Sequence, residues 1–126
     1  MVEVICDTNF LIHLANNRIK NISTLETEIG DIRFVVPDVV LAELEKLGRV
    51  EEKKHEIGAT MQYIKSFKTV NLGGSFADDS FISHVEKNGG VIATMDKDLK
   101  MAIKKAGGSI LTISNNKIVL EKRRSN

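Results

Sequence analysis

The chain has 126 residues, of which 42% are hydrophobic and 28% are charged, and this composition fits one globular domain with a core of ordinary size. Its 18 basic and 17 acidic residues leave a net charge of +1, which excludes a polycation that coats nucleic acid. A single cysteine excludes an internal disulfide. No apolar run approaches the ~20 residues of a membrane span and no signal peptide is evident, so we expect a soluble, cytoplasmic protein.

The chain begins with a short apolar strand that ends on a carboxylate. Residues 2–6 read Val-Glu-Val-Ile-Cys, which is typical of a strand in a parallel sheet, and Asp7 follows at once. Ligands of open α/β sheets bind at the carboxyl ends of the strands, so Asp7 is a candidate site residue. The alternative is that Asp7 only caps a helix that begins at Thr8.

Strand-like runs then alternate with amphipathic helical stretches. This alternation predicts a three-layer α/β/α fold with a central, mainly parallel five-stranded sheet. We expect a single domain over residues 1–126, with residues 122–126 as a flexible basic tail. Helices are expected at residues 8–16, 21–29, 39–47, 50–67, 78–86 and 98–106. Strands are expected at residues 2–6, 33–36, 69–72, 91–94 and 109–113, with a small edge strand at 117–120.

Two acids on helices are candidates to join Asp7. Glu43 lies beside the buried stripe of its helix, and from there its carboxylate could point into a crevice at the end of the sheet. The alternative is an ordinary surface glutamate. Asp78 shares a helical line with Phe81 and Val85, so we expect it to face inward at the first turn. The alternative for Asp78 is an acid placed there by the helix dipole.

Asp96 follows the fourth expected strand as Asp7 follows the first, and either Asp96 or Asp98 could cap the next helix. If the first and fourth strands are neighbours, Asp7 and Asp96 end side by side, with Asp78 at the start of the intervening helix. Such carboxylates repel one another unless some hold protons or a cation lies among them. Oxygen ligands without histidine or cysteine favour Mg²⁺ or Mn²⁺ over zinc.

These motifs, in this order, resemble the PIN-domain family of metal-dependent ribonucleases, and the resemblance covers nearly the whole chain. The pieces that carry it are Asp7-Thr8-Asn9, Glu43 within Leu-Ala-Glu-Leu, Ala77-Asp78-Asp79 and Thr94-Met95-Asp96. The resemblance implies a catalytic and metal-binding acidic quartet of Asp7, Glu43, Asp78 and Asp96. It implies supporting roles for Asn9, Thr94, Asp79 and Asp98. Which of Asp78 and Asp79 is the primary ligand stays open.

The resemblance implies an endoribonuclease that hydrolyses RNA phosphodiester bonds with one or two Mg²⁺ or Mn²⁺ ions. The sequence around Asp78 and Asp96 is similar to that of archaeal members close to ribosomal-RNA processing nucleases, and also to that of the toxins of toxin-antitoxin pairs. The implied partners are RNA, an antitoxin or a pre-ribosomal protein, and a second copy in a homodimer, with helix 50–67 as a candidate surface. Phosphate contacts are expected from Lys97, Lys100, Lys104, Arg123 and Arg124, although a solvated helix face and tail are the alternative.

Two other classes stay open at this point. One is a PIN-like scaffold without catalytic activity that binds RNA or assembles complexes. The other is a signalling receiver domain, which would resemble its family by an acid pair after the first strand and a lysine after the fifth. Here a single acid follows the first strand and Ser114-Asn115-Asn116 follows the fifth. Tyr63 is the only tyrosine and tryptophan is absent, so the sequence gives little sign of an aromatic platform for single strands.

Overall fold

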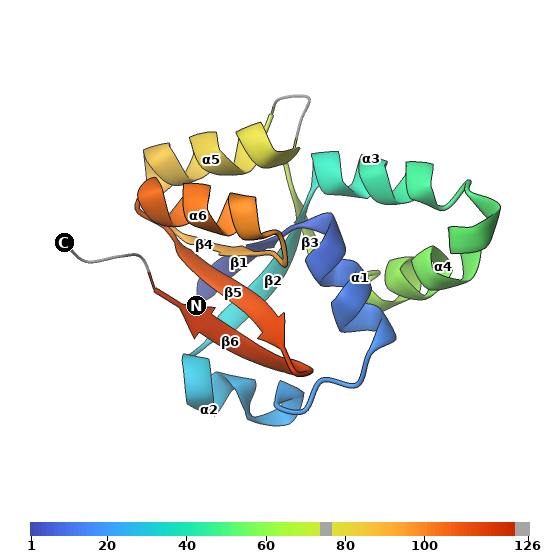
Figure 1. Ribbon diagram of the computed structural model, residues 1–126, viewed down its shortest axis with the longest axis horizontal. Helices are drawn as coiled ribbons and strands as arrows, with labels where there is room; N and C mark the ends of the chain where they lie inside the picture. The colour runs from blue at the N-terminus through green and yellow to red at the C-terminus, as the bar shows by residue number, and fades with distance from the viewer. Residues whose placement is uncertain (74–76, 123–126) are drawn as a thin grey trace.

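A computed structural model describes residues 1–73 and 77–122 of the chain. In this part the strands form one six-stranded sheet in the order β3-β2-β1-β4-β5-β6, with helices on both faces (Figure 1). The expected three-layer, mainly parallel class is confirmed. The strands are β1 (Val2–Cys6), β2 (Ile32–Pro37), β3 (Lys68–Val70), β4 (Val91–Ala93), β5 (Ser109–Ser114) and β6 (Lys117–Glu121).

The small edge strand expected at 117–120 is confirmed as β6. It pairs along its whole length with β5, so the sheet has six strands where five were expected. It is the antiparallel strand of the sheet. Asn115 and Asn116 connect the two strands with φ angles of 52° and 58°, a left-handed conformation that asparagine tolerates better than most residues. Two successive residues with positive φ suit the twist of a tight hairpin, so the Asn-Asn pair favours this connection.

The helices divide between the two faces of the sheet. In Figure 1, α1, α3 and α4 pack together on one face, and α5 and α6 lie side by side on the other. Within the described part of the chain, no helix is both long and apolar enough to cross a membrane. The helices are α1 (Thr8–Asn16), α2 (Leu25–Ile29), α3 (Asp38–Leu47), α4 (Lys54–Tyr63), α5 (Ala77–Asn88) and α6 (Lys97–Lys105).

Two helical stretches are shorter than the sequence suggested. The stretch expected at 21–29 is a 3₁₀ turn over Ile22–Thr24 followed by the five-residue α2. The stretch expected at 50–67 begins with a 3₁₀ turn over Glu51–Lys53, and α4 ends at Tyr63. After Tyr63 the backbone tightens, because the Phe67 amide donates to the Ile64 carbonyl at 2.9 Å, and the chain turns into β3.

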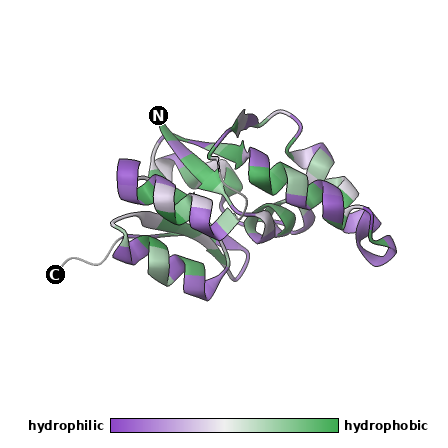
Figure 2. Ribbon diagram, turned by 90° about the horizontal axis from the view of Figure 1, so that it is seen from above, coloured by the Kyte–Doolittle hydropathy of each residue, from purple (hydrophilic) through white to green (hydrophobic). Residues whose placement is uncertain are grey.

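The register of the central strands places Asp7 beside the end of β4. β1 pairs in parallel with β2 on one side and with β4 on the other, with Cys6 opposite Ala93. The Asp7 amide continues this ladder by donating to the Ala93 carbonyl at 2.8 Å. Val4 and Cys6 are fully buried, and Figure 2 shows the hydrophobic positions gathered on the strands and on the helix sides that face them. The first and fourth strands therefore end together, as the sequence predicted.

Gly108 is packed so closely that a methyl group should not fit there. A Cβ atom at this position would lie 2.7 Å from a Val85 methyl, 2.9 Å from an Ile103 methyl and 3.2 Å from the Gly90 carbonyl oxygen. We expect Gly108→Ala to lower the free energy of unfolding by about 1–3 kcal/mol, the usual cost of overpacking. Denaturant unfolding measures this loss.

Gly58 provides the matched control, since it lies inside α4 and no other group comes within 4 Å of the place that a methyl group would take. Gly58→Ala should raise the free energy of unfolding by up to about 1 kcal/mol, because alanine is the better helix former. Equal stability of Gly108→Ala and the native protein would contradict the close packing around Gly108.

Candidate functional site: a carboxylate group at the strand ends

Asp7 is the buried member of the site. It follows β1 directly and is the N-cap of α1, and only 7% of its surface is exposed. Oδ1 accepts a hydrogen bond from the Thr8 amide at 2.8 Å, and Oδ2 accepts one from the Thr94 hydroxyl at 2.9 Å. The capping role that the sequence left open is therefore real, but it uses one oxygen only. The second oxygen is held by a residue 87 positions away in the sequence.

Thr94 links the two strand ends. It is fully buried just after β4, and its Oγ1 accepts from the Asp96 amide at 3.1 Å while its hydroxyl donates to Asp7. A hydroxyl has one donor and two acceptor lone pairs, so this single group serves both neighbours. Thr94 thereby fixes the rotamer of Asp7 and the start of the loop that carries Asp96.

The electrostatics of Asp7 show which other acids lie near it. Burial raises the pKa of the Asp7 carboxyl, whereas the hydrogen bonds from Thr94 and Thr8 lower it. The nearby charges of Asp78 and Glu43 raise the pKa of Asp7 further. The charges of acids on α3 and α5 therefore reach the carboxyl at the end of β1.

Glu43 and Asp78 lie on the open side of this group. Both are exposed. The expectation that Asp78 faces inward is wrong. The buried face of α5 runs through Ser80 and Phe81, and Asp78 lies beside this face and is exposed. Partial desolvation of its carboxyl nevertheless raises the pKa of Asp78, and the charges of Asp96 and Asp79 raise it further.

Asp96 resolves the question of which acid caps α6. Its Oδ1 accepts from the Leu99 amide at 3.0 Å, so Asp96 is the N-cap, and Asp98 is exposed in the first turn without this role. The carboxyl of Asp96 thus has one oxygen engaged by the helix, as Asp7 has. The charge of Asp96 also raises the pKa of Asp78, so the two acids interact electrostatically.

The remaining supporting candidates are less constrained. Asn9 and Asp79 are exposed, and Asp79 lies near enough to influence the pKa of Asp78. Beside Asp7, the Thr8 hydroxyl is buried and has no hydrogen-bond partner among the described residues. A buried hydroxyl without a partner is unfavourable, and in native structures it often marks the place of a bound water or ion.

The donor set fits a hard divalent cation. The charges of Asp78 and Glu43 reach Asp7, and the charge of Asp96 reaches Asp78, so the acids near the end of β1 offer oxygen donors without a histidine or cysteine, which is the preference of Mg²⁺ and Mn²⁺. Within residues 1–73 and 77–122, no three His, Cys, Asp or Glu side chains are gathered closely enough to form a complete metal site. Burial is the main cause of the raised pKa values of Asp7 and Asp78, and the neighbouring carboxylates raise them further; a bound cation would oppose both effects.

The basic residues expected to contact RNA divide into three groups. Lys97 is exposed at the start of α6. Lys104 Nζ lies 2.6 Å from Glu121 Oε1 and Lys100 Nζ lies 3.7 Å from Glu121 Oε2, so the opposite charge on β6 already pairs with both ammonium groups. This pairing makes Lys100 and Lys104 weaker candidates than the sequence suggested. Arg123 and Arg124, with the rest of the expected flexible tail beyond Lys122, lie outside the described residues.

Thr94 offers a direct test of how the two acids are positioned. We expect Thr94→Val to reduce the activity proposed below by about 10–100-fold, as is typical when an outer-shell partner of a metal ligand is lost. It should also destabilise the fold by about 1–3 kcal/mol, because the Asp96 amide loses its acceptor. Thr94→Ser, which keeps the hydroxyl, is the control and should retain most of the activity. Equal losses in both variants would indicate a packing role only.

Comparison with known proteins identifies relatives of this chain. A family model described as "PIN like domain" matches residues 4–116. Ribonuclease VapC9 of Archaeoglobus fulgidus is 32% identical over 105 residues, which cover 82% of this chain and 76% of the relative. The rRNA-processing protein fcf1 of Schizosaccharomyces pombe is 32% identical over 125 residues, and the chain spans only 63% of its length.

A solved structure shows the same fold. The PIN domain endonuclease Utp24 superposes with a TM-score of 0.77 at 30% sequence identity, over 95% of this chain and 91% of that one. The family model, which matches residues 4–116, includes Asp7, Glu43, Asp78 and Asp96. The chain therefore belongs to the family of PIN-like domains.

Proposed function

We propose that the protein is a metal-dependent endoribonuclease whose active site is the acidic quartet of Asp7, Glu43, Asp78 and Asp96. The observation that carries the proposal is the buried Asp7 carboxylate, held on both oxygens at the end of a central strand with acids of α3 and α5 close by. The relatives named as ribonucleases and the structural likeness to an endonuclease support it.

The four carboxylates would hold one or two Mg²⁺ or Mn²⁺ ions. When bound, such an ion supplies a Lewis acid that lowers the pKa of water and neutralises charge on a phosphate. The side chains contribute two different things. Asp7 and Asp96 are fixed by hydrogen bonds to the backbone and to Thr94, so they define where the site lies. Glu43 and Asp78 are exposed, so they leave room for water and for the scissile phosphate.

The reaction is hydrolysis of an RNA phosphodiester bond, in which water adds to phosphorus and the bond to the leaving oxygen breaks. An exposed carboxylate whose pKa is raised, such as Asp78, is suited to take a proton from the attacking water. The buried Asp7 cannot turn to follow the substrate, because both of its oxygens are engaged. We therefore assign to Asp7 the role of a fixed ligand that orients the metal site, and to the exposed carboxylate of Asp78 the role of proton acceptor.

Both biological settings of the relatives are candidates for this chain, namely RNA processing and a toxin-antitoxin pair. An antitoxin or a pre-ribosomal protein would then be the partner. The two settings differ in substrate: a processing enzyme would cut a precursor RNA at a defined site, whereas a toxin would cut another cellular RNA such as transfer RNA. Asn9 and Asp98 would support the quartet, and Asp79 is the alternative to Asp78 as the primary acid of α5.

The test is cleavage of end-labelled single-stranded RNA, a structured precursor rRNA and transfer RNA, each with Mg²⁺, Mn²⁺ or chelator. We expect cleavage with a divalent ion and none with chelator. A single cut in the precursor would favour processing, and cutting of transfer RNA would favour the toxin role. A folded protein that binds RNA but cuts nothing under any condition overturns the enzyme and favours a binding or assembly module.

A further inference from the structure

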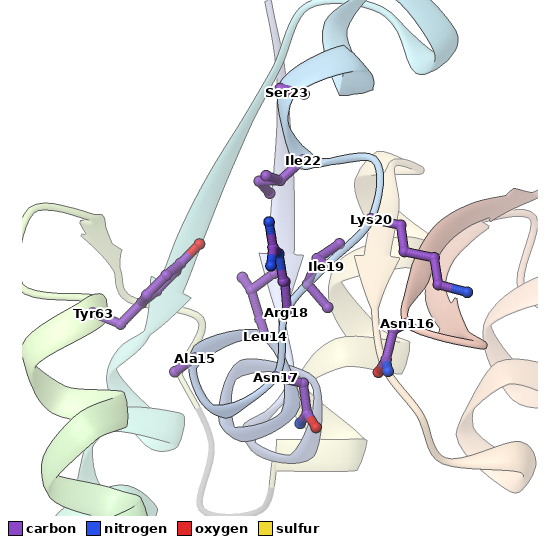
Figure 3. A pocket seen from close by; sticks show the side chains of 10 residues that line it. All are labelled: Leu14, Ala15, Asn17, Arg18, Ile19, Lys20, Ile22, Ser23, Tyr63 and Asn116. Atoms are coloured by element: carbon purple, nitrogen blue, oxygen red, sulfur yellow. The ribbon is translucent and has the colours of Figure 1, made fainter.

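A cleft lies at the far end of α1, away from the quartet. It has a volume of about 630 Å³ and is formed by the end of α1, the segment that follows it, the last residue of α4 and the turn between β5 and β6. The residues that matter for the argument are Leu14, Arg18, Lys20, Ile22, Tyr63 and Asn116. In Figure 3, Tyr63 lies on one side and Lys20 and Asn116 on the other, with Arg18 between them.

The cleft combines positive charge with an exposed flat ring. Arg18 and Lys20 are exposed, and none of the described residues that line the cleft is acidic. Tyr63 is 41% exposed and Ile22 is 46% exposed, so the cleft presents an aromatic ring and an apolar side chain beside its cations. Cationic grooves with an exposed aromatic ring bind single-stranded nucleic acid, because the cations contact phosphates and a base stacks on the ring.

Tyr63 is held in place by its neighbours. Its ring packs edge-on against Phe67 with centroids 5.8 Å apart, and Phe67 stacks on Phe34 with centroids 6.1 Å apart. One side of the tyrosine is therefore fixed by the core while part of the ring remains exposed. A rigid ring stacks with a base at low cost in conformational entropy, because few rotamers are lost on binding.

The opposite rim is also ordered. The Lys20 amide donates to the Asn116 carbonyl at 2.8 Å, which ties the segment after α1 to the β5–β6 turn. The Asn116 side-chain oxygen lies 3.1 Å from His13 Nε2, so the carboxamide is anchored from α1. Carboxamides are suited to hydrogen bonds with the edges of unstacked bases.

α1 connects this cleft to the quartet. Asp7 caps its first turn, while Leu14 and Ala15 of its last turn line the cleft. Nine helical residues span about 13 Å at ~1.5 Å per residue, so one short RNA strand can reach both places.

We propose that this cleft binds a nucleotide of single-stranded RNA a short distance along the strand from the scissile phosphate. The base stacks on Tyr63 beside Ile22, and Arg18 and Lys20 contact the phosphates that flank it. The continuation of the strand into the quartet rests on the proposed function, but RNA binding at the cleft can be measured without cleavage. The sequence did not indicate this site, and Tyr63 gives the aromatic contact that composition argued against.

The first test measures binding of a fluorescein-labelled 12-nucleotide oligouridylate by anisotropy, in an Asp7→Asn background with chelator. Tyr63→Leu should weaken binding by about tenfold, the usual effect of losing one stacked base, and Tyr63→Phe should bind like the parent. A plot of the logarithm of the association constant against the logarithm of salt concentration has a negative slope. Arg18→Ala with Lys20→Ala should make this slope less steep by about 1.4, because each phosphate contact on a single strand contributes about 0.7. Lys53→Ala with Lys87→Ala removes the same charge from exposed positions elsewhere and should leave the slope unchanged.

The second test compares long and short substrates in an otherwise native protein. Arg18→Ala with Lys20→Ala should raise KM for a 12-nucleotide substrate at least about fivefold with kcat unchanged, and should leave a trinucleotide unaffected. Circular dichroism confirms that each variant is folded. If cleavage occurs but no cleft variant alters binding or KM, the cleft proposal fails while the nuclease stands.

The binding test also separates two other outcomes. If nothing is cleaved but the cleft variants still weaken RNA binding, the cleft proposal stands without the nuclease. If the cleft variants abolish binding of a labelled peptide that alternates glutamate and leucine, and leave RNA binding intact, the occupant is an acidic protein segment and the RNA proposal is overturned.

Discussion

Asp7→Asn should abolish RNA cleavage and, in metal-free buffer at pH 7, raise the melting temperature. The loss of activity should reach at least about 100-fold, beyond the ~10–100-fold typical of an outer-shell residue, because Asp7 would bind the metal itself. The gain in stability follows from burial and from Asp78 and Glu43, which make the charged form of Asp7 unfavourable and raise its pKa. The amide has nearly the same shape and carries no charge. Its oxygen can still accept from the Thr8 amide, and its Nδ2 can donate to Thr94 Oγ1 in place of the bond that the hydroxyl donates to Asp7.

The direction of the pH dependence follows from the raised pKa. A carboxyl whose pKa is higher in the folded protein contributes its full stability below its unfolded pKa, and this contribution is lost as the pH rises through the folded value. The native protein should therefore lose stability as the pH rises from the unfolded to the folded pKa of Asp7, whereas Asp7→Asn should not. We expect a difference of about 2–5 °C at pH 7 that disappears near pH 4.

Thermal melts with and without Mg²⁺ or Mn²⁺ complete this experiment. A bound ion stabilises the folded state by mass action, so the native protein should melt higher with the ion and Asp7→Asn should not respond. Glu86→Gln removes a charge from an exposed position on α5 and should change neither activity nor melting. An Asp7→Asn protein that cuts RNA at the native rate would remove Asp7 from the active site.

Substitutions at Asp96 should separate its two roles. Asp96→Ser keeps an oxygen that can accept from the Leu99 amide, so α6 should remain capped and the fold should be as stable as the native one. Asp96→Ala loses the cap as well and should lower the free energy of unfolding by about 1 kcal/mol. Both remove a carboxylate from the quartet, so both should reduce cleavage by about 100-fold or more.

The contrast between these two variants decides what Asp96 does. Activity assays under conditions where both proteins are folded, combined with denaturant unfolding, provide the comparison. If Asp96→Ser cleaves RNA normally, the carboxylate serves only as a helix cap. If both variants are equally unstable, the serine does not replace the hydrogen bond to the Leu99 amide, and the comparison does not separate the charge from the cap. Asp96→Asn then replaces Asp96→Ser, because asparagine is an equally good cap.

The sequence predicted the strand ends well because these rest on local signals. Asp7 and Asp96 each follow an apolar run directly, and parallel strands place such positions at one edge. The exposure of Asp78 was mispredicted because the helical line through Phe81 does not mark the centre of the buried face of α5, which also includes Ser80. The pairing of Lys100 and Lys104 with Glu121 was not visible either, since it depends on β6 joining the sheet.

The cleft shows a different limit of sequence reasoning. Arg18, Tyr63 and Asn116 are 45 and 53 positions apart, and no motif links them. Their meeting depends on the route of the chain after α1 and on the tight Asn115-Asn116 turn. A lone tyrosine acquires a role only when the fold places cations around it.

The position of β1 in the middle of the sheet has a consequence for how the protein opens. Amide hydrogens of central strands exchange with solvent only in large openings, whereas those of edge strands and connecting segments exchange in small fluctuations. Asp7 is attached to β1 between β2 and β4, but the cleft is bordered by the segment at 17–24 and by the turn before the edge strand β6. Warming should therefore weaken nucleotide binding in the cleft first, so that affinity for long RNA declines while the quartet at the end of β1 is still assembled.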